Sequence, residues 1–126
     1  MTAHATFVYI ADDSEVVRSA LAGRLTAEGV SVHSGASLAE ALGLAALTVR
    51  GFSCALLDLD LGDGSGADVA DHLRVHQPVL PVAFFSGGAT AEVVARAQAI
   101  GPIFRKPEDL EDAVAWVKRH AALVAP

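Results

Sequence analysis

Five polar residues whose side chains suit phosphoryl chemistry each follow closely on a short apolar run: Asp12, Asp13, Asp58, Ser86 and Lys106. If these runs are parallel strands of one sheet, the five side chains emerge at the same edge, where such sheets form their ligand sites. Three carboxylates would then face a hydroxyl and an ammonium group. Carboxylate oxygens suit a hard divalent cation, and an ammonium group suits a phosphoryl oxygen. The residue types and their spacing therefore predict a site that holds a divalent cation beside a phosphoryl group.

The composition of the chain excludes several classes of protein. Its 126 residues suffice for one compact domain, and a net charge of -6 argues against nucleic-acid binding, which needs a basic face. No apolar run approaches the roughly 20 residues that span a bilayer, and the N-terminus lacks the basic segment of a signal peptide. The single Cys54 lies in an apolar run and predicts a buried thiol. We therefore expect a soluble cytoplasmic protein with no nucleic-acid or membrane partner.

Strand-like and helix-like patterns alternate along the chain. Short apolar runs predict five strands, at residues 7–11, 30–33, 54–59, 81–86 and 103–105. Amphipathic stretches between and after them predict five helices, at residues 14–29, 37–51, 69–77, 90–99 and 108–124. This alternation predicts a three-layer α/β fold, in which a doubly wound parallel sheet of five βα units has right-handed crossovers. We expect a single domain over residues 1–126.

Four short motifs at the predicted strand ends resemble the receiver domain of bacterial two-component response regulators. They are Asp12-Asp13, Leu57-Asp58-Leu59 with Gly66 eight residues past the aspartate, Ser86-Gly87 and Lys106-Pro107. Each motif alone is common, whereas all four in this order are specific. The resemblance runs from about residue 7 to residue 120 and implies the flavodoxin-like strand order 2-1-3-4-5, with the core of the domain at about residues 7–120.

The resemblance implies that Asp58 is the phosphoacceptor of a phosphorelay. Its carboxylate would attack the phosphorus of a phosphohistidine on a sensor histidine kinase or phosphotransfer protein, or of a small acyl phosphate, and form an aspartyl phosphate. Asp12 and Asp13 would hold Mg²⁺ together with Asp58 and the backbone carbonyl of Asp60. The cation would offset the repulsion between an attacking anion and an anionic donor. Such a domain is no enzyme in the usual sense, since it catalyses only its own phosphorylation and dephosphorylation.

The resemblance also implies a conformational switch. Lys106 would neutralise a phosphoryl oxygen, and Ser86 would turn its hydroxyl towards the phosphate and draw its loop inward. That movement would change the surface of the fourth predicted helix, the fifth strand and the fifth helix, on which a downstream protein target docks. Phe104, Trp116 and Arg119 lie in that segment and are candidate docking residues. We expect a monomer or a weak homodimer.

Three positions depart from the family pattern. Ile103 stands three residues before the lysine, where the family usually has tyrosine or phenylalanine, and the aromatic Phe104 comes one residue later. Gly62 replaces a common proline, which predicts a more mobile loop. Asp60 stands two residues past the acceptor, at a position that influences phosphate lifetime in the family. A family feature that the sequence does retain is the proline after the lysine, so we expect a cis peptide at Lys106–Pro107.

Three other functions share part of this pattern. Asp58-Leu-Asp60 resembles the D-x-D motif of haloacid-dehalogenase-type phosphohydrolases, which also form an aspartyl phosphate, but that family has a longer chain and no acid pair upstream. A calcium-binding EF-hand loop from Asp58 fails, because Gly62 and Val69 stand where the loop requires acidic ligands. A pseudo-receiver would use the same fold as a binding module without phosphorylation, although all five site residues are present.

Several polar and aromatic residues also have structural interpretations. Ser86 could be a turn hydroxyl and Lys106 a solvated lysine. His72 and His76 are four residues apart on a predicted helix, which is half a zinc site, but without further ligands a solvated helix face is expected. Trp116 lies off the apolar stripe of the last predicted helix and is expected to be a partly buried edge residue or a partner anchor.

Overall fold

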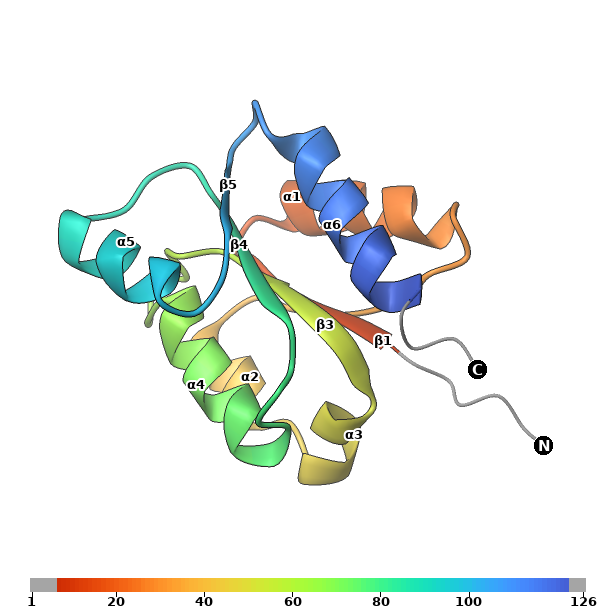
Figure 1. Ribbon diagram of the computed structural model, residues 1–126, viewed down its shortest axis with the longest axis horizontal. Helices are drawn as coiled ribbons and strands as arrows, with labels where there is room; N and C mark the ends of the chain where they lie inside the picture. The colour runs from red at the N-terminus through yellow and green to blue at the C-terminus, as the bar shows by residue number, and fades with distance from the viewer. Residues whose placement is uncertain (1–6, 123–126) are drawn as a thin grey trace.

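A computed structural model describes residues 7–122, which form one parallel sheet with helices on both faces (Figure 1). The strands are β1 (Phe7–Ala11), β2 (Ser31–Gly35), β3 (Phe52–Leu57), β4 (Val82–Ser86) and β5 (Ile103–Arg105). Their order across the sheet is β2-β1-β3-β4-β5, and every neighbouring pair is parallel. The predicted doubly wound α/β fold and its strand order are confirmed.

Helices connect the strands and cover both faces of the sheet. They are α1 (Glu15–Thr26), α2 (Leu38–Leu42), α3 (Ala46–Arg50), α4 (Gly66–His76), α5 (Ala91–Gln98) and α6 (Leu110–Ala122). Figure 1 shows α1 and α6 on one face of the sheet and the other four helices on the opposite face. Because a helix separates each strand from the next parallel strand, all five strands end at the same edge.

The sheet separates two hydrophobic cores. Successive residues of a strand point to opposite faces, so Leu56 of β3 enters the core under α1 and α6 while Leu57 enters the core under α2 to α5. Every residue of β3 is buried, which explains its unbroken apolar run. Cys54 is fully buried as predicted, and burial raises the pKa of its thiol to about 12.

Polar side chains fix the helix starts next to the polar edge of the sheet. Ser14 and Thr90 each accept a hydrogen bond from an amide in the first turn of α1 and α5, respectively. Ser65 and Asp68 form a capping box at the start of α4. These caps satisfy amide groups that a helix leaves unpaired. Each of these helices therefore begins at a defined residue, after a loop that follows a strand end.

The predicted helix at residues 37–51 is two short helices. α2 ends at Leu42, the chain turns at Gly43, and α3 begins at Ala46. Glycine costs a helix interior about 1 kcal/mol relative to alanine. Leu44, in the turn, packs against the core under α2 to α5. The apolar pattern therefore continues across the turn, and it predicts one helix where the structure has two.

Other element boundaries differ from the predictions by a few residues. β2 extends to Gly35, β3 covers residues 52–57 in place of 54–59, and α6 begins at Leu110 in place of residue 108. The predicted end of the last helix at residue 124 and the N-terminal segment before Phe7 lie outside the described residues.

The predicted placement of Trp116 is wrong. Its side chain is only 7% exposed and belongs to the core under α1 and α6. Its ring stacks on that of His120, one turn later, with 4.0 Å between the centroids. α6 contacts α1 as well as the sheet, so its buried face is wider than the predicted apolar stripe of Leu110, Ala113, Val114 and Val117. Trp116 is therefore a core residue and not an exposed anchor.

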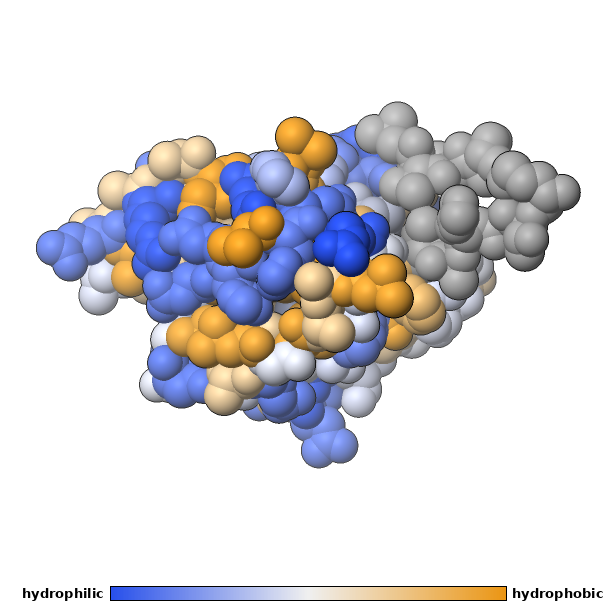
Figure 2. All heavy atoms as spheres, turned by 90° about the horizontal axis from the view of Figure 1, so that it is seen from below, coloured by the Kyte–Doolittle hydropathy of each residue, from blue (hydrophilic) through white to orange (hydrophobic). Residues whose placement is uncertain are grey.

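The outer face of α2, α3 and α4 carries separate apolar patches among charged side chains (Figure 2). Large apolar side chains are exposed in and beside these helices at Leu42, Leu47, Val75 and Val79. Exposed apolar residues that are scattered in this way are normal on protein surfaces. Within residues 7–122, no helix combines the length and the hydropathy needed to cross a membrane.

The loop after β3 is attached to the start of α2. The two carboxylate oxygens of Asp63 accept hydrogen bonds from the amides of Leu38 and Ala39, each at 2.9 Å. These hydrogen bonds hold the pKa of the Asp63 carboxyl below its usual range, and the bond from the Ala39 amide has the larger effect. Gly62 beside it has φ of 82°, a left-handed conformation that glycine adopts without strain. The loop that we expected to be mobile thus has a fixed attachment point.

Replacing Asp63 by asparagine is expected to lower the midpoint of thermal unfolding at neutral pH, because a side-chain amide offers one acceptor oxygen to two amide donors. A carboxyl whose folded pKa is depressed stabilises the fold above its unfolded pKa of about 3.9, and this contribution is lost as the pH falls through the folded pKa. The midpoints of wild type and Asp63→Asn should therefore converge as the pH falls below about 4. Calorimetry across this range measures the difference, and a difference independent of pH would contradict the role of the carboxylate.

Candidate functional site

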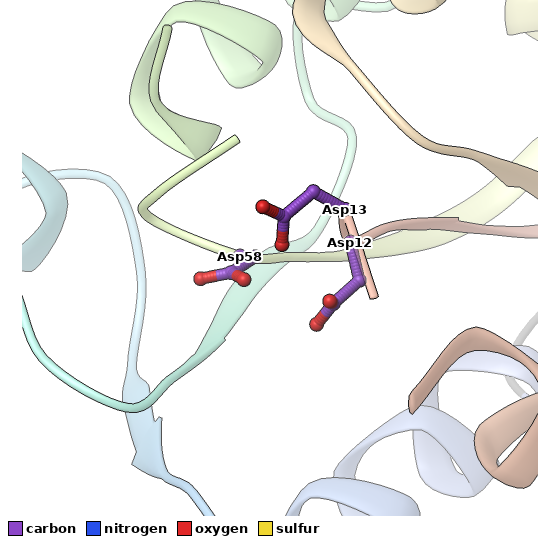
Figure 3. A group of neighbouring side chains, drawn as sticks. All are labelled: Asp12, Asp13 and Asp58. Atoms are coloured by element: carbon purple, nitrogen blue, oxygen red, sulfur yellow. The ribbon is translucent and has the colours of Figure 1, made fainter. Parts of the chain in front are cut away.

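The five predicted site residues lie at one edge of the sheet. Asp12 and Asp13 follow β1, Asp58 follows β3, Ser86 ends β4 and Lys106 follows β5. Figure 3 shows the three carboxylates extending from the ends of β1 and β3, which are neighbours in the sheet, into a shared space. The topology therefore brings together residues that are up to 94 positions apart in the sequence.

The three aspartates are the only group of three or more potential metal ligands within residues 7–122. Each offers a carboxylate oxygen, and these oxygens lie within 4.8 Å of one another. Asp12 and Asp58 are buried, whereas Asp13 is exposed, so the group opens to solvent on one side. Oxygen ligands at a partly open site suit Mg²⁺, which keeps several waters. The donor set therefore fits a magnesium ion.

Lys106 joins two of the three carboxylates. Its Nζ lies 2.6 Å from Oδ2 of Asp12 and 2.9 Å from Oδ2 of Asp58. The ammonium group also lies 5.7 Å from the centroid of the Phe85 ring. Taking one carboxylate out of water is costly, and two adjacent ones also repel each other. The ammonium group of Lys106 offsets part of this cost at the edge of the sheet.

Burial and ion pairing act differently on the pKa values of Asp58 and Lys106. Burial raises the pKa of the Asp58 carboxyl, and the lowering effects of the Asp60 amide and of Lys106 do not fully compensate. Burial alone would lower the pKa of Lys106, but its bonds to Asp12 and Asp58 outweigh burial and raise it. Ion pairing therefore favours the charged form of Lys106, whereas burial makes the charge on Asp58 costly. A further cation at the site would reduce that cost.

The backbone around Asp58 is closely packed. Its amide donates to the carbonyl of Ala11 at 2.8 Å, and its Oδ1 accepts a hydrogen bond from the Asp60 amide at 3.1 Å. A Cβ atom at Gly66 would overlap the carbonyl oxygen of Asp58 and come within 2.9 Å of Cβ of Leu57. Glycine at this position therefore lets α4 start directly against the end of β3. The side chain of Asp60 is exposed and accepts from a loop amide, outside the group of three carboxylates.

Ser86 lies at the edge of the sheet, but its hydroxyl turns into its own loop. It accepts a hydrogen bond from the Gly88 amide at 3.4 Å and donates to the Gly88 carbonyl at 3.3 Å, both long distances. A cavity of about 380 Å³ beside it is lined by Ser86, Lys106, Val94 and Ile103, among others. The loop after β4 therefore has weak internal bonds and open space next to it. The predicted cis peptide at Lys106–Pro107 is present.

Other candidate residues lie elsewhere. His72 and His76 are half-buried and pack edge to face, with 5.6 Å between ring centroids, and no third metal ligand joins them within the described chain. Phe104 is half-buried against the core under α1 and α6, and Arg119 is exposed. Of the three candidate docking residues, Arg119 is therefore fully available at the surface, Phe104 only in part, and Trp116 is buried.

Arg18 contacts the site and was not found from the sequence. Its Nη1 donates to the backbone carbonyl of Asp12 at 2.6 Å, from one turn inside α1. The sequence feature that could have pointed to this contact is an arginine in the first turns of a helix that follows an acid pair. The direction of its side chain, however, depends on how α1 packs on the sheet.

The fold and the polar edge together define a flavodoxin-like α/β domain with an acidic site at the carboxyl ends of its strands. The family described as response regulator receiver domain matches residues 8–120, and the chain belongs to this family. Receiver domains are signalling domains of two-component systems that interact with histidine kinases and downstream effectors and bind Mg²⁺ at an acidic pocket. Family membership opposes the dehalogenase-type alternative, and no enzyme family is indicated.

Known relatives agree with this family. The chain is 32% identical over 120 residues to the acid tolerance regulatory protein ActR of Sinorhizobium medicae (strain WSM419), covering 93% of this chain and 61% of that protein. The non-phosphorylated HemR receiver domain from Leptospira biflexa superposes with a TM-score of 0.79 at 26% identity, covering 96% and 98% of the two chains. A Burkholderia pseudomallei response regulator, solved with a phosphorylated aspartic acid, calcium ion and citrate, gives a TM-score of 0.70 at 25% identity, covering 94% and 70%. The chain thus spans less than two thirds of the curated relative.

Proposed function

We propose that the chain is a phosphorylation switch in which Asp58 accepts a phosphoryl group from a histidine kinase, a phosphotransfer protein or a small acyl phosphate. One observation carries the proposal: three carboxylates offer oxygens within 4.8 Å of one another, and the Lys106 ammonium group contacts two of them. Family membership and the phosphorylated aspartic acid of the Burkholderia relative support the same chemistry.

Asp12, Asp13 and Asp58, with the backbone carbonyl of Asp60, are the residues that would hold Mg²⁺. The bound cation would supply positive charge against the anionic donor and the charge that develops on the phosphoryl oxygens. A carboxylate oxygen of Asp58 then forms a bond to phosphorus while the bond from phosphorus to the histidine nitrogen or acyl oxygen of the donor breaks. The product is an aspartyl phosphate on the chain and a free imidazole or carboxylate on the donor.

Lys106 moves from two carboxylates to the phosphoryl group in this proposal. Its ammonium group already contacts Oδ2 of Asp58 at 2.9 Å, so a phosphoryl group on Asp58 is within reach of a small side-chain movement. A lysine suits this exchange because it is a compact charge on a flexible stem. Asp12, the second partner of Lys106, would hold the cation, and the ammonium group would then be free to leave that carboxylate.

The output would follow from a movement of the loop after β4. Ser86 is held there by long hydrogen bonds beside a cavity of about 380 Å³, which leaves room for its hydroxyl to turn towards the phosphate. Because the second predicted helix is divided into α2 and α3, the family's fourth helix, fifth strand and fifth helix are here α5, β5 and α6. We propose this α5–β5–α6 surface as the docking site of a downstream protein, with Arg119 as an exposed contact.

The proposal is tested by incubating the chain with acetyl phosphate and Mg²⁺ and measuring its intact mass. A single added phosphoryl group is expected, and the addition should disappear when a chelator removes the metal. A chain that gains no mass would be a pseudo-receiver. Multiple turnovers on a phosphomonoester, without a lasting adduct, would instead indicate a phosphohydrolase.

A further inference from the structure

The acid pair that follows β1 is held through its backbone. The amide of Asp12 donates to the carbonyl of Gly35 at 3.1 Å, and the amide of Ser14 donates to Oδ1 of Asp12 at 2.9 Å. The carbonyl of Asp12 accepts from Nη1 of Arg18 at 2.6 Å, which is a short, charge-assisted bond. Asp12 is only 2% exposed, so its carbonyl has little water to replace that partner.

The carbonyl that Arg18 holds belongs to the peptide group that joins Asp12 to Asp13. A peptide group is planar, so fixing its oxygen fixes the plane and thereby the positions of the backbone nitrogen and Cα of Asp13, from which its side chain extends. The Asp13 side chain is exposed, and its carboxylate makes no hydrogen bond to another side chain or to backbone within the described chain. Its position relative to Asp12 and Asp58 therefore depends on the peptide group before it.

We propose that Arg18 is a positioning residue for the metal site, which orients the Asp12–Asp13 peptide so that both carboxylates face one cation. The inference rests on the proposed function, because it assigns Mg²⁺ to this acid pair. Mutating residues that hold metal ligands in place typically weakens metal affinity by about 10- to 100-fold. Arg18 contacts Asp12 through its main chain only and acts through it.

The guanidinium charge of Arg18 also affects Mg²⁺ affinity, but it lowers the affinity that positioning raises. A positive charge near a cation site disfavours the cation, so removing it would tighten Mg²⁺ binding if charge alone mattered. Loss of the peptide orientation would weaken binding. The sign of the change in Mg²⁺ affinity therefore distinguishes positioning from simple repulsion.

The test is the dissociation constant of Mg²⁺, measured by calorimetric titration on the full chain. Arg18→Gln is expected to weaken Mg²⁺ binding about tenfold, at the low end of the range for residues that support metal ligands. Arg18→Lys keeps one charged donor and should restore most of the affinity. Arg24→Gln is the matched control, since Arg24 lies on the same helix and pairs with Glu111 away from the site. It should leave the affinity unchanged.

Two results separate this inference from the proposed function. Wild-type protein that binds no Mg²⁺ would overturn the proposed function itself. Wild-type protein that binds Mg²⁺, with Arg18→Gln binding it equally well or more tightly, would overturn only the role of Arg18. Denaturant unfolding of the same variants identifies any loss of fold. If Arg18→Gln does not fold, Arg18→Met, which keeps an unbranched stem without a donor, replaces it and has the same expected result.

Discussion

Replacing Asp58 by asparagine is expected to abolish phosphoryl uptake from acetyl phosphate. A carboxamide lacks the anionic oxygen that attacks phosphorus, and its replacement also removes one of three carboxylates that lie within 4.8 Å of one another. The fold should survive the change. Burial raises the pKa of Asp58, so its ionised form destabilises the folded chain at neutral pH, and the neutral amide relieves that cost. Asp58→Asn should therefore be at least as stable as wild type in urea, while its intact mass stays unchanged after incubation.

Asp60→Asn is the matched control for this experiment. It makes the same chemical change two residues later, on a side chain that is exposed and outside the carboxylate group. Asp60→Asn should gain one phosphoryl group as wild type does, with any difference confined to the lifetime of the adduct. Normal labelling of Asp58→Asn would show that another residue is the acceptor. Loss of labelling in Asp60→Asn alone would favour the D-x-D interpretation of the loop.

The position of the site could be predicted because it depends on strand ends alone. Asp58 and Lys106 each follow a short apolar run, and the βα alternation makes the strands parallel. Parallel strands end at one edge whatever their order, so residues at those ends converge without any knowledge of side-chain packing. The strand order itself came from the family resemblance. The close approach at Gly66 agrees with that resemblance, since only glycine leaves room for the Asp58 carbonyl.

Features that depend on side-chain direction could not be predicted in the same way. Arg18 reaches the Asp12 carbonyl because α1 packs against β2 and α6 at a particular angle, which the apolar periodicity does not specify. The contact of Lys106 with two carboxylates depends equally on packing. The break at Gly43 was hidden because Leu44 keeps the apolar pattern through the turn. Each of these features depends on tertiary packing, which the local sequence pattern does not specify.

The burial of Trp116 also depends on packing and could not be predicted from the sequence. Its replacement has the largest expected effect on the free energy of unfolding. The helical stripe of Leu110, Ala113, Val114 and Val117 suggested a narrow buried face, whereas α6 buries Trp116 as well, at 7% exposure. Trp116→Ala is expected to reduce the free energy of unfolding by about 3–5 kcal/mol, because it removes a large buried ring and leaves a cavity. Domains of this size have unfolding free energies of roughly 5–15 kcal/mol, so the loss is a large share of the total.

Trp116→Phe and Arg119→Ala test whether this loss comes from packing. Phenylalanine fills most of the space, so Trp116→Phe should reduce the free energy of unfolding much less than Trp116→Ala does. Arg119→Ala, at an exposed position on the same helix, should change the free energy of unfolding by no more than about 0.5 kcal/mol. Unfolding in urea should be followed by far-UV circular dichroism, since Trp116 is the only tryptophan. A Trp116→Ala variant with wild-type stability that fails to bind a downstream partner would restore the anchor hypothesis. A destabilised Trp116→Ala variant would show that Trp116 is a core residue. Arg119, which is exposed, is then the residue at which the α5–β5–α6 surface can be tested without disturbing the fold.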